Sequence, residues 1–187
     1  MDKGAAACWV RASPFACRRP LPARDDAPLS RRPSQQPSQR PGQRVHATCV
    51  ALRTGRGWQG VLLRGRSGAG KSDLALRLIE AGARLVADDQ TELVRQGKKV
   101  IASAPATIAG LIEARGIGIV KLDRDQLVVR APVVLLVDLA MPEHIERLPE
   151  PARERLLGVD LPVVALAPFE GSAPAKLRLA LRRIAAA

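Results

Sequence analysis

One stretch of eight residues has the types and spacing needed to hold phosphate groups. Residues 65–72 match the pattern G-x-x-x-x-G-K-[S/T] at every required position. Glycines let a tight loop bring its backbone N–H groups close to phosphate oxygens, and a following helix adds the positive end of its dipole. In such a loop the lysine neutralises the β- and γ-phosphates, and the hydroxyl ligates Mg2+. We expect ATP and Mg2+ to be bound by Gly65, Arg66, Ser67, Gly68, Ala69, Gly70, Lys71 and Ser72.

The residues on either side of this loop fit a strand that leads into it and a helix that leaves it. Gly60-Val61-Leu62-Leu63 is a short apolar run of the kind found in buried strands. From Ser72 to Ala81, apolar residues recur at the spacing of a helix with one apolar face. A strand, a glycine-rich loop and a helix in this order are the context in which the loop motif is specific.

Phosphoryl transfer also needs carboxylates, and the sequence offers several. Asp88 and Asp89 directly follow the apolar residues 85–87, so they are expected at the carboxyl end of a strand, where α/β sheets bind ligands. There one carboxylate can carry a proton while its neighbour holds a metal ion. Asp138 follows the apolar run 133–137 in the manner of a Walker B acid and is a direct rival.

Two further candidates are Glu113 and His46. Glu113 stands two residues before Arg115, so their side chains share one face of a strand beside two glycines. A structural ion pair is the plainer interpretation of those two residues. His46 lies in an expected strand before the loop, where a lone histidine is more often packed or exposed than catalytic. The residues alone leave the choice among the carboxylates open.

Charge is unevenly distributed along the 187 residues. The formal net charge is +12, and residues 1–44 hold nine Lys/Arg against three Asp/Glu, a net charge of +6. Those residues are rich in Pro, Gln, Ser and Arg, a composition that buries too little apolar surface to order a chain. We expect residues 1–44 to be a disordered basic arm, with a transit peptide and an over-extended start as alternatives. Residues 45–187 are expected to form the folded domain.

Composition also narrows the setting of the protein. No apolar run is long enough to span a membrane. Cys8, Cys17 and Cys49 are odd in number and lack CxxC spacing, which favours a reducing cytoplasm over a disulfide framework or a zinc site. Few aromatic residues and no basic recognition helix argue against a nucleic-acid partner. A moderately basic domain suits acidic ligands such as nucleotides.

The hydrophobic periodicity predicts an α/β fold with a largely parallel or mixed sheet flanked by helices. The expected strands span residues 46–52, 60–63, 84–87, 111–112, 117–122 and 132–137, with a hairpin over 91–101. The expected helices span residues 72–81, 147–157 and 176–184.

Residues 45–187 resemble the catalytic domain of HPr kinase/phosphorylase. The resemblance rests on the segments GRSGAGKSDLALRLIEAG, ARLVADD and IEARGIGIV, the last of which is similar to the family signature E-x-R-G-x-G. It implies an ATP-dependent kinase that phosphorylates a serine of an HPr-type phosphocarrier protein and so regulates a phosphotransferase system. The reverse reaction, phosphorolysis, is left open. The resemblance further implies a homo-oligomer and a P-loop fold similar to phosphoenolpyruvate carboxykinase.

The same resemblance implies roles for the acidic candidates. Asp88 would be the general base that activates the serine hydroxyl, and the general acid when phosphate attacks in reverse. Asp89 would support Asp88 and the magnesium site. Glu113 would help to hold the metal together with Ser72.

The resemblance also implies roles for the remaining candidates, and the sequence departs from the family pattern at three places. Arg115 would steady phosphate or the acidic cluster, His46 aligns with an active-site histidine, and Asp138 becomes structural. Arg66 occupies a loop position that is often acidic in the family. The basic loop near the C-terminus has Lys176 as its nearest counterpart, and the arm stands where longer members carry an N-terminal domain.

Other functions fit parts of the pattern. A nucleotide-binding switch would use Asp138 as its metal-binding acid and would be insensitive to loss of Asp88. A kinase of small molecules would need a lid insertion, for which this short chain shows little room. A nucleic-acid-associated protein would bind with steep salt dependence that is lost when residues 1–44 are removed.

Overall fold

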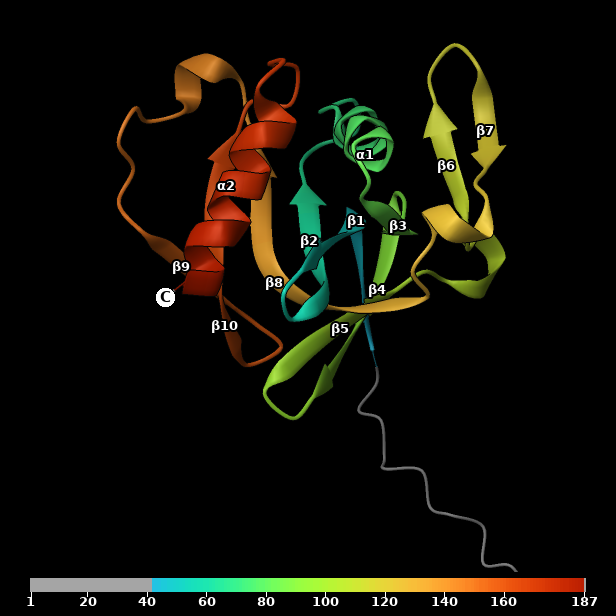
Figure 1. Ribbon diagram of the computed structural model, residues 1–187, viewed down its shortest axis with the longest axis horizontal. Coiled ribbons are helices and arrows are strands. Elements are labelled where there is room, and N and C mark those ends of the chain that lie inside the picture. The colour runs from blue at the N-terminus through green and yellow to red at the C-terminus, as the bar shows by residue number, and fades with distance from the viewer. Residues whose placement is uncertain (1–41, 187) are drawn as a thin grey trace, which may run out of the picture. The chain divides into compact units, whose positions relative to one another are not determined.

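The computed structural model describes residues 42–186, which form a mixed α/β fold of ten strands and two α-helices (Figure 1). The first half contains β1 (Gln43–Thr54), β2 (Gly57–Arg64), α1 (Lys71–Glu80), β3 (Arg84–Ala87), β4 (Gln90–Gln96), β5 (Lys99–Ser103), the 3-10 turn η1 (Ala106–Ile108) and β6 (Leu111–Ala114). The second half contains β7 (Gly118–Lys121), η2 (Arg124–Gln126), β8 (Arg130–Leu139), η3 (Pro142–His144), β9 (Ala152–Leu156), β10 (Val159–Leu166) and α2 (Ala173–Ala186).

Eight of these strands form one sheet whose pairing closes on itself. The order runs β2-β1-β4-β5-β8, and β8 pairs again with β2. β3 adds to β1, while β10 and then β9 continue from β8. Between these strands, only the β2–β8 and β8–β10 pairs are parallel, so the sheet is mixed rather than largely parallel. β6 and β7 pair separately as a hairpin.

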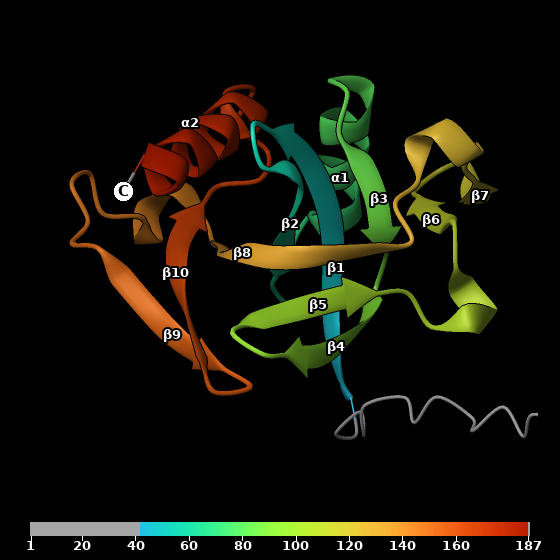
Figure 2. The same cartoon turned by 60° about the horizontal axis from the view of Figure 1, so that its bottom comes forward.

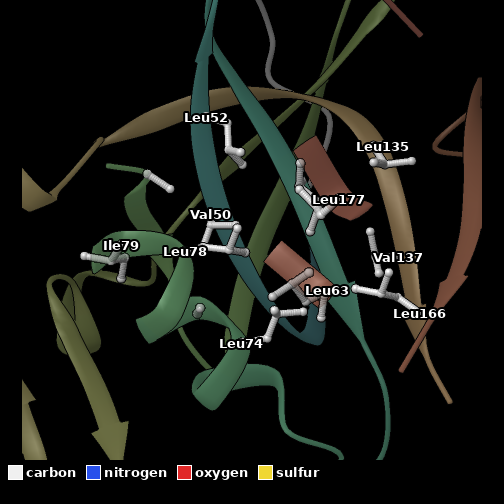
Figure 3. Close-up of a cluster of buried hydrophobic side chains, with 14 of the residues drawn as sticks. Val50, Leu52, Leu63, Leu74, Leu78, Ile79, Leu135, Val137, Leu166 and Leu177 are labelled. Atoms are coloured by element: carbon white, nitrogen blue, oxygen red, sulfur yellow. The ribbon is translucent and has the colours of Figure 1, made fainter. Parts of the chain in front are cut away.

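Alternation along the central strands sends their side chains into two cores. Val50 of β1 faces Leu78 of α1 and Leu177 of α2 in the first core (Figure 3). Cys49, one residue earlier, faces Leu93 of β4 and its neighbours in the second core. Both helices therefore cover the same face of the sheet, and the β4–β5 hairpin closes the opposite face (Figure 2).

The helix predicted over residues 147–157 is wrong, because this segment ends in a strand. β9 pairs antiparallel with β10 through a turn at Leu157 and Gly158. Both turn residues have positive φ, 50° and 76°, as in the two-residue turns that match strand twist. Pro149 and Pro151 disfavour helix upstream, and Leu157 packs against the second core. The hairpin thus forms from long-range packing that helical periodicity does not reveal.

The predicted arm falls almost wholly outside the residues that the structure describes. Residues 1–41 lie outside them, and so do Cys8 and Cys17. β1 begins at Gln43, two residues before the expected start of the domain, and the Arg44 guanidinium donates to Glu92 at 2.8 Å. Neither helix within residues 42–186 has the length and apolarity needed to cross a membrane.

Candidate active site

Residues 65–72 form a loop that joins the end of β2 to the start of α1. Gly65 must lack a side chain, because a Cβ there would lie 2.9 Å from Cβ of Ala69. Gly70 is the N-cap of α1 and has φ 84°, a left-handed conformation that glycine adopts without steric cost. The first N–H groups of α1 have no partner within the helix and face the loop end. This is the geometry that holds anionic oxygens at a helix N-terminus.

Lys71, the first residue of α1, folds its side chain back across this loop. Its Nζ donates to the carbonyl oxygens of Gly65 and Arg66, at 3.0 and 3.1 Å. It also lies 3.0 Å from Nε2 of His46 on β1. Only 6% of Lys71 is exposed, so these three acceptors replace water around its charge.

Asp88, directly after β3, is the best-connected carboxylate of the site. Its Oδ1 accepts hydrogen bonds from the hydroxyls of Thr48, at 2.7 Å, and Ser72, at 2.9 Å. Its Oδ2 accepts from Ser72, at 3.1 Å, and from the backbone N–H of Glu113, at 3.0 Å. Asp88 is 5% exposed. Three elements, β1, α1 and β6, therefore fix one carboxylate beside the last residue of the loop.

Asp89 turns away from its neighbour toward His46. Its φ of 60° is left-handed, which is uncommon outside glycine and directs the carboxylate back over β1. Oδ1 of Asp89 lies 3.0 Å from Nδ1 of His46. Because the Lys71 ammonium can only donate, Nε2 of His46 accepts and Nδ1 carries the proton toward Asp89. Asp89, His46 and Lys71 thus form one chain of polar contacts that ends in the loop.

Glu113 and Arg115 are placed differently from the other candidates. The backbone of Glu113 reaches Asp88, whereas its side chain is exposed on β6. Arg115 is exposed in the turn between β6 and β7. Neither side chain makes a hydrogen bond or ion pair within residues 42–186, so the alternative interpretation, a structural Glu113–Arg115 ion pair, does not hold there.

The oxygen donors nearest the loop are the Ser72 hydroxyl and the Asp88 carboxylate. Mg2+ is commonly held by one or two protein oxygens together with substrate phosphates, and this pair suits that chemistry. Of the other expected ligands, Asp89 pairs with His46 at 3.0 Å, and the Glu113 side chain is exposed. Across the described residues, no cluster of three or more His, Cys, Asp or Glu side chains is positioned to hold a metal ion by itself.

Asp138, the rival carboxylate, is paired with arginine at the end of β8. Its two oxygens accept from Nε and Nη2 of Arg64, at 2.7 and 2.9 Å. Arg64 also donates to Glu154 of β9 at 2.7 Å. That hydrogen bond lowers the pKa of the Glu154 carboxyl and, with Asp138, raises the pKa of Arg64. Arg64 therefore links β2, β8 and β9, and both carboxylate oxygens of Asp138 are hydrogen-bonded to it.

Thr48 is a residue of the site that the sequence motifs do not single out. A strand places residues i and i+2 on the same face, so Thr48 and His46 of β1 both face the loop side. That spacing was the available signal. A cavity of about 520 Å3 lies elsewhere, between the β1–β2 turn and α2, and contains none of the candidate residues. Its lining consists of Leu52, Arg53, Thr54, Gly55, Arg178, Leu181 and Arg182.

The fold and this arrangement define an α/β domain built around a glycine-rich loop, a nearly buried lysine and a nearly buried carboxylate. The family model described as "HPr Serine kinase C-terminal domain" matches residues 40–177, and the chain belongs to that family.

Individual relatives and a solved structure agree with this membership. The chain is 42% identical over 123 residues to the HPr kinase/phosphorylase of Chlorobaculum tepidum, covering 60% of this chain and 36% of that protein. It is 37% identical over 101 residues to the HPr kinase/phosphorylase of Clostridium tetani, covering 54% and 32%. The match thus spans about a third of these relatives. The Hpr(Ser) kinase/phosphatase structure from Coxiella burnetii superimposes with a TM-score of 0.65 at 30% identity, covering 75% of this chain and 89% of that one.

Proposed function

We propose that this chain is the catalytic part of an ATP-dependent serine kinase that phosphorylates an HPr-type phosphocarrier protein in the cytoplasm. One observation carries the proposal: Asp88, a nearly buried carboxylate, is hydrogen-bonded to the hydroxyl of Ser72, the last residue of the loop. A proton acceptor and a phosphate-binding loop are thereby fixed side by side. The names of the matched relatives supply the substrate class.

The residues of this site suggest how the transfer would proceed. The N–H groups of residues 65–72 bind the phosphates of ATP, and Lys71 moves its hydrogen bonds from loop carbonyls to phosphate oxygens. Asp88 accepts the proton of the substrate serine hydroxyl as its oxygen attacks the γ-phosphorus. The new serine oxygen–phosphorus bond forms while the bond between the γ-phosphorus and the bridging oxygen breaks, and ADP leaves.

Mg2+ would be held by Ser72 with a neighbouring carboxylate, Asp88 or Asp89. When bound, it supplies charge neutralisation on the phosphate oxygens. Ser72 donates to Asp88 in this structure, so ligation would require its hydroxyl to turn from that carboxylate. The side chains of Glu113 and Arg115 are exposed on the hairpin whose backbone reaches Asp88, so they would meet the transferred phosphate or the incoming carrier protein.

The competing switch mechanism has less support. It requires Asp138 as the metal-binding acid, yet both oxygens of that carboxylate accept hydrogen bonds from Arg64. Reverse phosphorolysis, with Asp88 as the general acid, belongs to the same proposal because the curated relatives carry the name phosphorylase. The expected likeness to phosphoenolpyruvate carboxykinase and the homo-oligomer stay predictions.

The decisive experiment follows labelled γ-phosphate from ATP to a purified HPr-type protein. We expect wild-type chain to label a serine on the carrier, and a carrier with that serine replaced by alanine to stay unlabelled. Asp88→Asn should lower the transfer rate by about 10²- to 10⁴-fold, which is the rate enhancement that a general base usually supplies. Asp138→Asn is the matched control, because it changes a carboxylate of equal charge near the loop.

Two results would contradict the proposal. One is tight ATP binding without transfer to the carrier by the wild-type chain. The other is loss of nucleotide turnover in Asp138→Asn with normal turnover in Asp88→Asn. Circular dichroism of both variants should match that of the wild-type chain, so that a folding defect is not read as lost catalysis.

A further inference from the structure

Phe169 lies beside the glycine-rich loop, although it is about 100 residues away in sequence. β2, β8 and β10 run parallel, so the segments that follow them meet at one edge of the sheet. The 65–72 loop follows β2, and Phe169 follows β10. A Cβ added to Gly70 would lie 2.9 Å from Cζ of Phe169, so the ring occupies the place of a missing side chain. Ligands of α/β sheets bind at this edge.

The aromatic ring of Phe169 is exposed to solvent, in a chain that contains few aromatic residues. Phe169 is 67% exposed, in a chain with two Phe, two Trp and no Tyr. The exposed face of the ring contributes no burial free energy to this fold, whereas a large aromatic ring contributes most when another group covers it.

The backbone on both sides of the ring is anchored to the helix that starts at the loop. Arg77 of α1 donates to the carbonyl oxygen of Pro168 and, at 3.3 Å, to that of Glu170. Arg77 is itself paired with Asp73 on the same helix at 2.7 Å. The ring is therefore held at a fixed position relative to α1 and Gly70, rather than carried on a free loop.

We propose that Phe169 is the surface on which the base of the nucleotide stacks. The inference rests on the proposed function, in which the 65–72 loop binds the triphosphate. Once the phosphates occupy the loop, the nucleoside extends from that same edge, where the exposed ring supplies an apolar plane. A base can stack on the ring without hydrogen bonds from the protein to the edge of the base. Removing an aromatic stacking partner weakens the binding of a base by roughly fivefold to a hundredfold. Purines, with the larger faces, should bind better than pyrimidines.

The test compares ATP with inorganic tripolyphosphate, which carries the phosphates but no base. Titration of the full chain should show that Phe169→Ala raises the Kd for ATP at least fivefold and leaves the Kd for tripolyphosphate unchanged. Phe169→Trp should restore ATP affinity, and ATP but not tripolyphosphate should quench the added tryptophan fluorescence. Val129→Ala is the control, since Val129 is 84% exposed and precedes β8, at the end of that strand remote from the loop.

Several outcomes would overturn the inference while leaving the proposed function intact. Equal weakening of ATP and tripolyphosphate would show that the ring only supports the loop through Gly70. Unchanged ATP affinity would place the base elsewhere, and a raised KM for the carrier protein alone would make Phe169 a protein-docking residue. A wild-type chain that binds neither ATP nor tripolyphosphate would overturn the proposed function together with this inference.

Discussion

Lys71 shows how a charged residue is kept nearly out of water before any phosphate arrives. Its ammonium is bound by two loop carbonyls and by His46, which in turn contacts Asp89. Binding of a triphosphate must exchange some of these contacts for phosphate oxygens. His46 would then act on the loop through Lys71, as a positioning residue, rather than on the substrate serine.

We therefore expect His46→Ala to destabilise the nucleotide-free protein more than the nucleotide-bound protein. Loss of one hydrogen bond to a nearly buried ammonium should lower the free energy of unfolding by about 1–2 kcal/mol. The deficit should shrink in saturating ATP and Mg2+, because phosphate replaces the imidazole as acceptor. Urea unfolding with and without nucleotide measures both values, and His46→Gln, which retains an acceptor, is the matched control. An equal deficit in both conditions would contradict this role.

Cys49 gives a second prediction at this scale. Complete burial in the second core raises the pKa of its thiol to about 12, so almost none is thiolate at pH 8. We expect iodoacetamide to leave Cys49 unmodified in native buffer at pH 8 and to alkylate it in 8 M urea. Mass spectrometry of the peptide that contains Cys49 reads this site alone. Rapid native alkylation would mean that the sheet opens frequently at β1.

At the scale of elements, Arg64 links β2, β8 and β9 through Asp138 and Glu154. The lowered pKa of Glu154 means that its contribution to stability is present above its ordinary pKa of 4.5 and is lost as pH falls through the lower, folded value. The pair is partly exposed, so we expect Glu154→Gln to cost a few tenths to about 1 kcal/mol at pH 7.

The pH dependence of that variant separates the ion pair from packing. The difference between wild type and Glu154→Gln in urea unfolding should shrink as pH falls below 4.5 and vanish once the carboxyl is protonated in the folded protein as well. Glu150→Gln is the control, because it neutralises an exposed carboxylate four residues away that does not pair with Arg64. A deficit that stays constant as pH falls below 4.5 would assign the cost to lost side-chain packing instead.

Much of the site could be predicted because its signals are local. A strand, a loop and a helix follow one another within residues 57–80, and Asp88 is placed by the short strand before it. The contact between His46 and Lys71 joins residues 25 positions apart, and the closure of β8 onto β2 joins residues more than 70 apart. Such pairings depend on tertiary packing, which hydrophobic periodicity does not report. The helix prediction over residues 147–157 was wrong for the same reason.

For the whole described domain, the two cores share the strands β1, β2 and β8. We therefore expect Leu78→Ala in the first core and Leu93→Ala in the second to lower the stability of one common transition, each by about 2–5 kcal/mol. Far-UV circular dichroism and the fluorescence of Trp58, which packs on the second core, should give the same midpoint. Trp9→Phe provides the background in which Trp58 is the only emitter. Separate midpoints would show that the cores unfold independently.

The closed pairing of β2-β1-β4-β5-β8 also bears on how copies of this domain meet one another. A strand with an unpaired edge is a template for aggregation, and ring closure removes that template from these five strands. The outer side of β3 is covered by backbone pairing with Leu127 and Val128. Among residues 42–186, β9 remains as the free edge of the large sheet, and its sequence Ala-Arg-Glu-Arg-Leu presents alternating charges there. Where residues 42–186 of two copies meet, we therefore expect contact through side-chain surfaces and not through strand addition.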